Sequence, residues 1–243
     1  MPDLHPAAIA FRDPAALLDR CEIGGVRRLF GEPGYESGAV LPAGDWAPLT
    51  DDLPARYAPS VFTQDSGLVE FFRLPATVTD ASSLAALVGE LGDPFPVPLS
   101  PTDDPPGEPV THRLPETALR PGLHIDNRQN LSYADCVGAR RRLCVNLGPG
   151  TRYLLLATTT IKDCCRAVRD PYETHHPHTE DFWRYLAARR PVSVLRIRVE
   201  PGEGWLAPTV ILPYDESTED EELPSATASW LGNWERGLFG PLI

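Results

Sequence analysis

Gly122-Leu123-His124-Ile125-Asp126-Asn127 is the stretch of sequence on which the interpretation of the whole chain depends. Side chains alternate between the two faces of a β-strand, so His124 and Asp126 point to one side and Leu123 and Ile125 to the other. An imidazole and a carboxylate on one face are two of the three ligands in the 2-His-1-carboxylate set, which binds non-haem Fe(II) and leaves coordination positions open. A hydrogen-bonded His–Asp pair at a strand end explains the same pattern, so the motif alone leaves both interpretations open.

The composition indicates a globular protein with many strands and turns. The chain has 243 residues, of which 42% are hydrophobic and 27 are prolines. This length suits one large domain, and the prolines favour strands joined by stiff turns over a helical bundle. We therefore expect a single domain over residues 1–243. Within it, residues 1–92 form an N-terminal segment of helices and strands, residues 93–121 a proline-rich loop and residues 122–243 the β core.

The charge and the cysteines restrict the expected partners and compartment. A formal net charge of −12 disfavours nucleic acid and anionic membranes as partners. No apolar run approaches membrane-spanning length, and the N-terminus lacks the basic and apolar regions of a signal peptide. Five cysteines without zinc-like spacing favour reduced thiols. These features together predict a cytoplasmic protein.

Hydrophobic periodicity predicts the main helices and strands. The expected helices cover 80–92 and 179–190, where apolar side chains recur on one face. The expected strands cover 69–74, 140–148, 152–160, 192–200, 205–212 and 226–230. Gly148-Pro149-Gly150 is a tight turn, which predicts a hairpin between the strands on either side of it.

Two further segments carry histidines whose roles the sequence leaves open. Residues 93–121 contain nine of the prolines, and so long a loop is either a functional cover over the site or a disordered connection. His112 lies in this loop, and the sequence assigns it no role. His175, His176 and His178 could bind a metal, but Pro177 interrupts the cluster, and a surface or lid loop before a helix is the favoured interpretation.

From His124 to Phe239 the chain resembles the Fe(II)/2-oxoglutarate-dependent oxygenase superfamily. The resemblance rests on Leu123-His124-Ile125-Asp126, the strand over 142–148, and the turn and strand over 201–209. It implies a mainly β fold with flanking helices, a double-stranded β-helix or jelly roll. It also implies Fe(II) bound by His124 and Asp126, 2-oxoglutarate as cosubstrate, and a small molecule of specialised metabolism as substrate. Arg142 and Asn146 share a strand face and could bind the carboxylate of the cosubstrate.

The chain also departs from this superfamily at two positions. Tyr214 stands where the second histidine ligand is expected, and residues 214–235 contain no Arg or Lys to bind the far carboxylate of 2-oxoglutarate. Three interpretations follow. The chain is a metal oxygenase in which Tyr214, Asp215 or water completes the ligands; or it has lost iron and 2-oxoglutarate and is a redox-neutral cyclase, isomerase or lyase; or it is a non-catalytic binding protein. In the second, His124 and Asp126 form a general-base pair and Tyr214 is the acid. The first is the working hypothesis.

Overall fold

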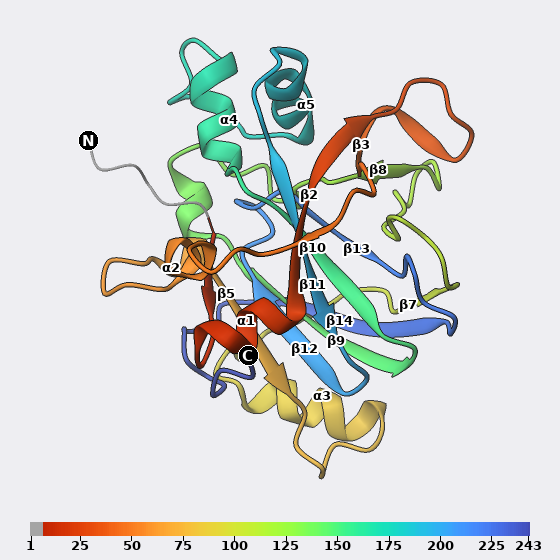
Figure 1. Ribbon diagram of the computed structural model, residues 1–243. Coiled ribbons are helices and arrows are strands. Elements are labelled where there is room, and N and C mark those ends of the chain that lie inside the picture. Colours follow the sequence, from red (N-terminus) through yellow and green to blue (C-terminus); the bar gives the residue numbers. More distant parts are fainter. Residues whose placement is uncertain (1–6) are drawn as a thin grey trace.

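The computed structural model describes residues 7–243 and shows a mainly β protein (Figure 1). Two seven-stranded sheets form a nearly closed, barrel-like arrangement. The first sheet has the order β1-β5-β12-β9-β14-β6, and β7 also pairs with β14. Its strands are β1 (Ala8–Ala10), β5 (Leu68–Arg73), β6 (Val97–Pro98), β7 (Thr102–Asp104), β9 (Arg141–Pro149), β12 (Glu203–Ala207) and β14 (Ser225–Gly232).

The second sheet lies opposite the first and has the order β13-β10-β11-β2-β3-β8, with β4 also paired to β2. Its strands are β2 (Cys21–Arg28), β3 (Tyr35–Pro42), β4 (Ala47–Pro48), β8 (Arg120–Gly122), β10 (Arg152–Ala157), β11 (Ser193–Val199) and β13 (Tyr214–Ser217). The predicted strands over 69–74, 140–148, 192–200 and 226–230 correspond to β5, β9, β11 and β14.

Helices cover the outside of the sheets. They are α1 (Pro14–Arg20), α2 (Leu53–Tyr57), α3 (Ala81–Glu90), α4 (Ile161–Val168) and α5 (Thr179–Ala187). Figure 1 shows α3 at one end of the molecule and α4 and α5 together at the other. The predicted helices over 80–92 and 179–190 are α3 and α5, and the N-cap of α5 is His178, one residue before the predicted start. Among residues 7–243, no helix combines the length and apolar character needed to cross a membrane.

Among residues 7–243, two hydrophobic clusters lie on the two sides of the second sheet, and another packs α3 against the first sheet. Along β10, Leu154 and Leu156 face the space between the sheets, where they join the cluster that contains Trp205. The side chain of Leu155 points the other way and joins a cluster with Phe182 of α5. A strand buried on both faces is apolar at successive positions, which explains the unbroken run of leucines in β10.

The predicted hairpin around Gly148-Pro149-Gly150 is wrong, because β9 and β10 belong to different sheets. β9 pairs with β12 and β14, whereas β10 pairs with β11 and β13. The turn instead lies in close contact with the backbone of Leu223 and Pro224, and the Gly150 N–H donates to the Pro224 carbonyl at 2.8 Å. The turn therefore carries the chain from one sheet to the other.

The predicted strand over 205–212 is too long, because β12 ends at Ala207. Pro208 has no N–H to donate to a neighbouring strand. The Pro208 carbonyl accepts hydrogen bonds from Ile211 and Leu212, at 2.9 and 3.1 Å. The resulting turn crosses to the second sheet, where β13 begins at Tyr214.

The N-terminal strands are part of the barrel rather than a separate preceding segment. β2 and β3 extend the second sheet beyond β11, and β1 and β5 extend the first sheet beyond β12. Leu195 of β11, for example, lies opposite Ile23 of β2. The β core therefore includes strands on both sides of the proline-rich segment and is not confined to residues 122–243.

Residues 93–121, called the strap below, are ordered and cross from the first sheet to the second. β6 and β7 of the strap pair with β14, whereas β8 pairs with β3. Between these strands, the Thr111 N–H donates to the Glu216 carbonyl at 2.9 Å, which places the middle of the strap beside β13. β8 then carries the chain from the end of the strap to Gly122, two residues before His124.

Gly122, directly after the strap, allows β8 to approach β3 closely. Its φ is +68°, and an added Cβ would collide with the backbone of Val40. Gly122→Ala should therefore lower the free energy of unfolding by about 3 kcal/mol or more, which urea denaturation measures. Gly107→Ala is the matched control, because Gly107 has a φ of +80° but open space around it. Only the backbone cost of about 1–2 kcal/mol is expected there, and equal losses in the two variants would contradict the steric argument.

Candidate functional site

An isolated β-bridge positions the central histidine of the site. His124 and Tyr214 pair in antiparallel fashion, with N–H to carbonyl distances of 3.0 and 2.9 Å. Two residues further on, the Asp126 N–H donates to the Thr209 carbonyl at 2.9 Å. The expected alternation holds: Leu123 and Ile125 pack in the hydrophobic cluster near α5, whereas His124 and Asp126 approach each other.

The hydrogen bonds of His124 fix the tautomer of its ring. Nδ1 lies 2.8 Å from the Gly122 carbonyl, which can only accept a hydrogen bond, so Nδ1 carries the proton. Nε2 is then left with a free lone pair. This nitrogen is buried, has no hydrogen-bond partner among the described residues, and lies 3.7 Å from Oδ1 of Asp126. A carbonyl that fixes the other ring nitrogen in this way is typical of histidines that bind metals.

The second oxygen of the Asp126 carboxylate is held by two other side chains. The Tyr214 hydroxyl donates to Oδ2 at 2.5 Å, and Nη1 of Arg142 donates to the same oxygen at 3.2 Å. Burial by itself would raise the pKa of Asp126, but the charge of Arg142 and the hydrogen bond from Tyr214 hold this pKa well below its ordinary value. Asp126 is therefore an ionised carboxylate with Oδ1 left to face His124.

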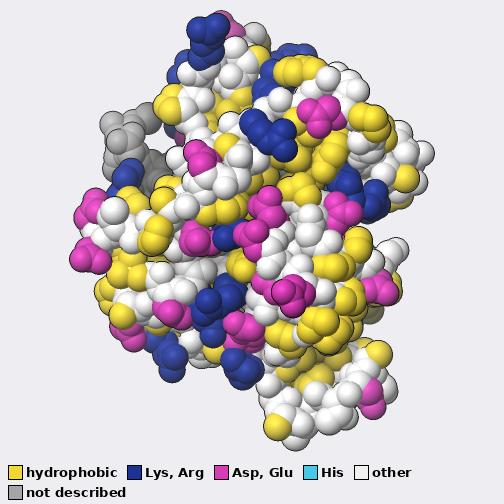
Figure 2. Space-filling view, turned by 45° about the vertical axis from the view of Figure 1, so that its right-hand side comes forward, with side chains coloured by type: hydrophobic (Ala, Val, Ile, Leu, Met, Phe, Trp, Pro, Cys, Tyr) yellow, Lys and Arg dark blue, Asp and Glu magenta, His cyan; other side chains and the backbone are white. Residues whose placement is uncertain are grey.

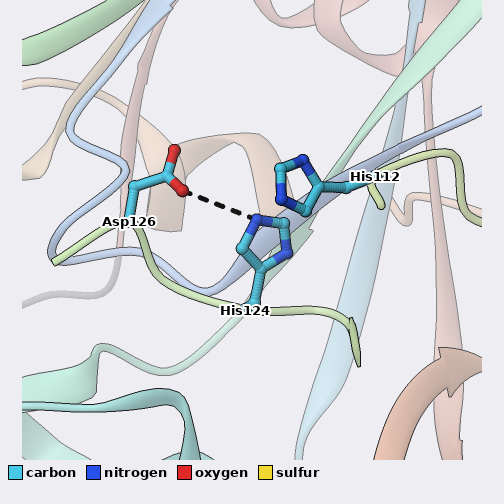
Figure 3. Close-up of side chains that lie close together, drawn as sticks. All are labelled: His112, His124 and Asp126. Carbon is cyan, nitrogen blue, oxygen red and sulfur yellow. Dashed lines mark ion pairs between the residues drawn. The ribbon is translucent and has the colours of Figure 1, made fainter. Parts of the chain in front are cut away.

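His112, to which the sequence assigned no role, lies directly beside this pair. Its ring stacks on that of His124 with centroids 4.1 Å apart, and Figure 3 shows a nitrogen of each ring on the side of Asp126. Ligand atoms of His112, His124 and Asp126 all lie within 4.8 Å of one another. The strap is fixed here because the His112 N–H donates to Oδ1 of Asp215 at 3.1 Å.

Both histidines are uncharged in this environment. Burial lowers the pKa of His112 to about 2, with a further contribution from the adjacent His124. Burial also lowers the pKa of His124, against the opposing effect of Asp126. A neutral imidazole with a free lone pair is the form that binds a metal ion. The three residues therefore make a compact group of two neutral imidazoles and one carboxylate.

Tyr214 occupies the place expected for a third ligand, and its hydroxyl is engaged with protein groups. It donates to Asp126 and accepts a hydrogen bond of 2.5 Å from Nη1 of Arg142. Burial raises the pKa of Tyr214 well above its ordinary value, so the side chain is a neutral phenol. Its role in this arrangement is to hold the carboxylate in place, while His112 is the second imidazole of the group.

Of the two residues expected to bind a carboxylate cosubstrate, Arg142 lies at the site and Asn146 lies away from it. Arg142 lies at the site, where it contacts Asp126, Tyr214 and the Ser229 hydroxyl. The Asn146 side chain lies at the turn between β9 and β10. It donates to the carbonyls of Gly150 and Val199, at 3.0 and 2.9 Å, and accepts from the Gly148 N–H. Asn146 therefore anchors this turn and does not line the cavity at the site.

A cavity of about 300 Å³ opens beside these residues. The strap and β13 form much of its wall, and its lining includes Thr111, His112, Arg113, Pro115, Arg128, Arg142, Tyr214, Asp215 and Glu216. The molecular face drawn in Figure 2 carries acidic, basic and hydrophobic side chains intermixed. The volume is at the lower end of the range for small-molecule sites.

The other histidine cluster supports α5. His175 Nε2 lies 2.7 Å from the Asp181 carboxylate, and His176 Nδ1 lies 2.7 Å from the Asn130 carbonyl. Cys165, His175 and Asp181 are close enough together to share an ion. Asp181, however, already accepts from Arg169 at 2.6 Å and from the His178 N–H at 2.9 Å. We interpret Asp181 as a capping and ion-pairing centre for the helix.

Comparisons with known proteins identify no family for this chain. No protein-family model matches it, and no curated protein matches it significantly. The geometry of the site therefore carries the functional argument.

Arg142 should be essential for stability because it neutralises a buried carboxylate. Arg142→Met leaves Asp126 without its cation, which should cost about 3–5 kcal/mol of unfolding free energy. Asp126→Asn added to this variant removes the buried charge and should restore most of the loss, as measured by urea denaturation. Arg27→Met, at an exposed position on β2, should change stability by less than about 0.5 kcal/mol. An equal loss in the single and double variants would show that Arg142 acts through packing alone.

Proposed function

We propose that the cavity is the active site of a metal-dependent, oxygenase-like enzyme acting on a small molecule. The observation that carries this proposal is the buried Nε2 of His124, which has a free lone pair, no hydrogen-bond partner among residues 7–243, and a carboxylate oxygen 3.7 Å away. A buried polar atom without a partner costs about 1–3 kcal/mol, and a bound metal ion would remove this cost. The adjacent His112 completes a donor set of two imidazoles and one carboxylate.

These residues fit a non-haem iron ion. Two neutral imidazoles and one carboxylate form the ligand set of such centres. Iron held in this way supplies open coordination positions for oxygen and for substrate. Zinc binds the same donor types, so the choice of metal rests on the resemblance over 124–239 as well as on the ligands.

The surrounding residues prepare the ligands for this role. The Gly122 carbonyl holds the His124 ring in the tautomer that exposes Nε2. Tyr214 and Arg142 occupy Oδ2 of Asp126, so only Oδ1 is free to bind. Partners of this kind commonly change metal affinity by about 10- to 100-fold when they are removed. The geometry thus favours binding of Asp126 through a single oxygen.

The strand order supports the finer fold assignment to a double-stranded β-helix. From the strap onwards the chain alternates between the sheets: β7 in the first, the bridge at His124 in the second, β9 in the first, and β10 and β11 in the second. β12, β13 and β14 then continue the alternation. We propose that this winding is a jelly roll extended on one side by β1, β2, β3 and β5.

The residues expected to bind 2-oxoglutarate do not fit that role. Arg142 is already bound to Asp126, Tyr214 and Ser229, and Asn146 is committed to backbone groups of a turn. Arg152, another buried arginine, is paired with Asp104 at 3.2 Å. We therefore propose no step that depends on this cosubstrate.

Metal binding by purified protein tests the proposal directly. Under anaerobic conditions the wild-type chain should bind about one Fe(II) or Co(II), and Co(II) should give a visible absorption spectrum. His112→Ala, His124→Ala and Asp126→Ala should each abolish this binding. His176→Ala is the matched control, because this exposed histidine contacts only a backbone carbonyl, and it should bind the metal as the wild type does.

Tyr214→Phe separates a supporting role from a ligand role. The variant should keep the metal stoichiometry and lose about 10- to 100-fold in affinity, because Asp126 loses one hydrogen bond. Complete loss of metal in Tyr214→Phe, together with normal binding by His112→Ala, would show that the phenol and not the strap histidine is the third ligand. Failure of the wild-type chain to bind any divalent metal would reject the proposed function.

A redox-neutral enzyme is the second candidate, favoured by the Tyr214 hydroxyl that lines the cavity beside Asp126. In that case Tyr214 is the acid and His124 with Asp126 the base, and activity should survive chelators and anaerobic conditions. Tyr214→Phe should then lower activity by about 10²- to 10⁴-fold. Loss of activity in chelator with little effect of Tyr214→Phe would exclude this candidate.

A further inference from the structure

Most of the charged side chains that line the cavity already have protein partners. Arg142 is paired with Asp126 at 3.2 Å, and Asp104 and Glu216 are both paired with Arg152 at 3.2 Å. Asp215 accepts hydrogen bonds from backbone N–H groups, including that of His112 at 3.1 Å. Except for Oδ2 of Asp215, which is buried without a hydrogen-bond partner among the described residues, these charged groups are engaged within the protein and are not free to recognise a ligand.

Two arginines that line the same cavity, Arg113 and Arg128, differ from these groups because they have no close anionic partner. Arg128 is exposed and forms no ion pair with any residue in 7–243. Arg113 has a side chain that is 48% exposed, and its only ion-pair contact within those residues is a distant one, 3.9 Å from Oε1 of Glu108. That oxygen is bound much more closely by Arg120, at 2.5 Å. Both Arg113 and Arg128 therefore present guanidinium groups that lack a close anionic partner.

The positions of these arginines relate them to the proposed metal ligands. Arg113 directly follows His112 on the strap, and Arg128 follows Asp126 by two residues. Both line the cavity that also contains His112 and Tyr214 in its wall. Among the lining acids, Asp103 is exposed and forms no ion pair in the described part of the chain, whereas Asp215 is buried and held by backbone N–H groups. The exposed charges at the cavity that lack a close partner are therefore two arginines and one carboxylate.

We propose that the cavity binds a small carboxylate-bearing molecule, with the carboxylate held by Arg113 and Arg128 and the rest of the molecule directed toward His112, His124 and Asp126. Guanidinium groups bind carboxylates with paired, charge-assisted hydrogen bonds. In a chain of net charge −12, two such cations at one cavity provide local attraction for an anion. This proposal rests on the proposed function, since it places the ligand beside the proposed metal site.

The carboxylate could belong to the substrate or to a 2-oxo acid cosubstrate, and two probes distinguish these sources. Succinate offers plain carboxylates, whereas 2-oxoglutarate also carries a 2-oxo acid end that chelates metals. We suggest measuring the binding of both by calorimetry, in metal-free protein and in protein loaded with redox-inert Zn(II). Succinamide, which lacks the charges, is the matched ligand control.

Arg113→Gln and Arg128→Gln should each weaken succinate binding by about tenfold, as expected for loss of a charge-assisted interaction. Arg27→Gln, at an exposed position on β2, should have no effect. If Zn(II)-dependent binding of 2-oxoglutarate weakens in parallel, the arginines hold the cosubstrate. If it does not, they hold the carboxylate of the substrate. Either result supports the proposal.

Two results would overturn the proposal. One is equal succinate binding by wild type and by the Arg113→Gln/Arg128→Gln double variant; the other is a wild-type chain that binds neither probe, or binds succinamide as well as succinate. Zn(II) affinity measured on the same variants distinguishes failure of the carboxylate-binding proposal from failure of the proposed metal-dependent function. Normal Zn(II) binding without arginine-dependent anion binding rejects only the carboxylate site. Arginine-dependent succinate binding without any metal binding rejects only the proposed function.

Discussion

The short bridge between His124 and Tyr214 is the contact on which the geometry of the site depends. Its two backbone hydrogen bonds join the segment directly after the strap to β13. These two parts of the chain are far apart in the sequence. The bridge sets the imidazole and the phenol side by side, with ring centroids 4.8 Å apart. Asp126, Arg142 and Ser229 are then arranged around this pair by side-chain hydrogen bonds. A single backbone pairing thus sets the relative positions of the imidazole, the phenol and the carboxylate at the site.

Much of the secondary structure could be predicted, because it depends on local periodicity and capping. The helix α3 is an example: Asp80 caps it, and Leu84 and Val88 bury one face. Sheet membership could not be predicted in the same way. The sequence around Gly148-Pro149-Gly150 is that of two strands joined by a tight turn, and the same pattern serves for a hairpin and for a crossing between facing sheets. The outcome is decided by β11, β12 and β14, which are distant in the sequence.

At the site, too, some contacts could be predicted from neighbouring residues, whereas others depend on residues far away in the sequence. Alternation of side chains along an extended segment was sufficient to predict that His124 and Asp126 lie together, although the pairing there is an isolated bridge and not a full strand. His112 lies in a proline-rich stretch without periodicity, and it reaches the site because the Asp215 carboxylate holds the backbone of the strap. The residues next to His112 in the sequence give no indication of the contact with Asp215. Tyr214 was indicated by the resemblance, which places it where a second histidine ligand is expected, whereas its partnership with Arg142 depends on β9 and β13 lying in facing sheets.

The position of the three clustered ligands has a consequence for the order of folding. They all lie between residues 112 and 126, so one short loop brings them together, whereas a ligand at residue 214 would require closure of a much longer loop. The entropy lost on closing a loop grows with the logarithm of its length, and short loops close within about 100 ns. The entropic cost of assembling the proposed metal centre is therefore that of closing a short loop. Because Asp215 and Tyr214 of β13 hold His112 and Asp126, that loop closes together with the docking of β13 and not before it.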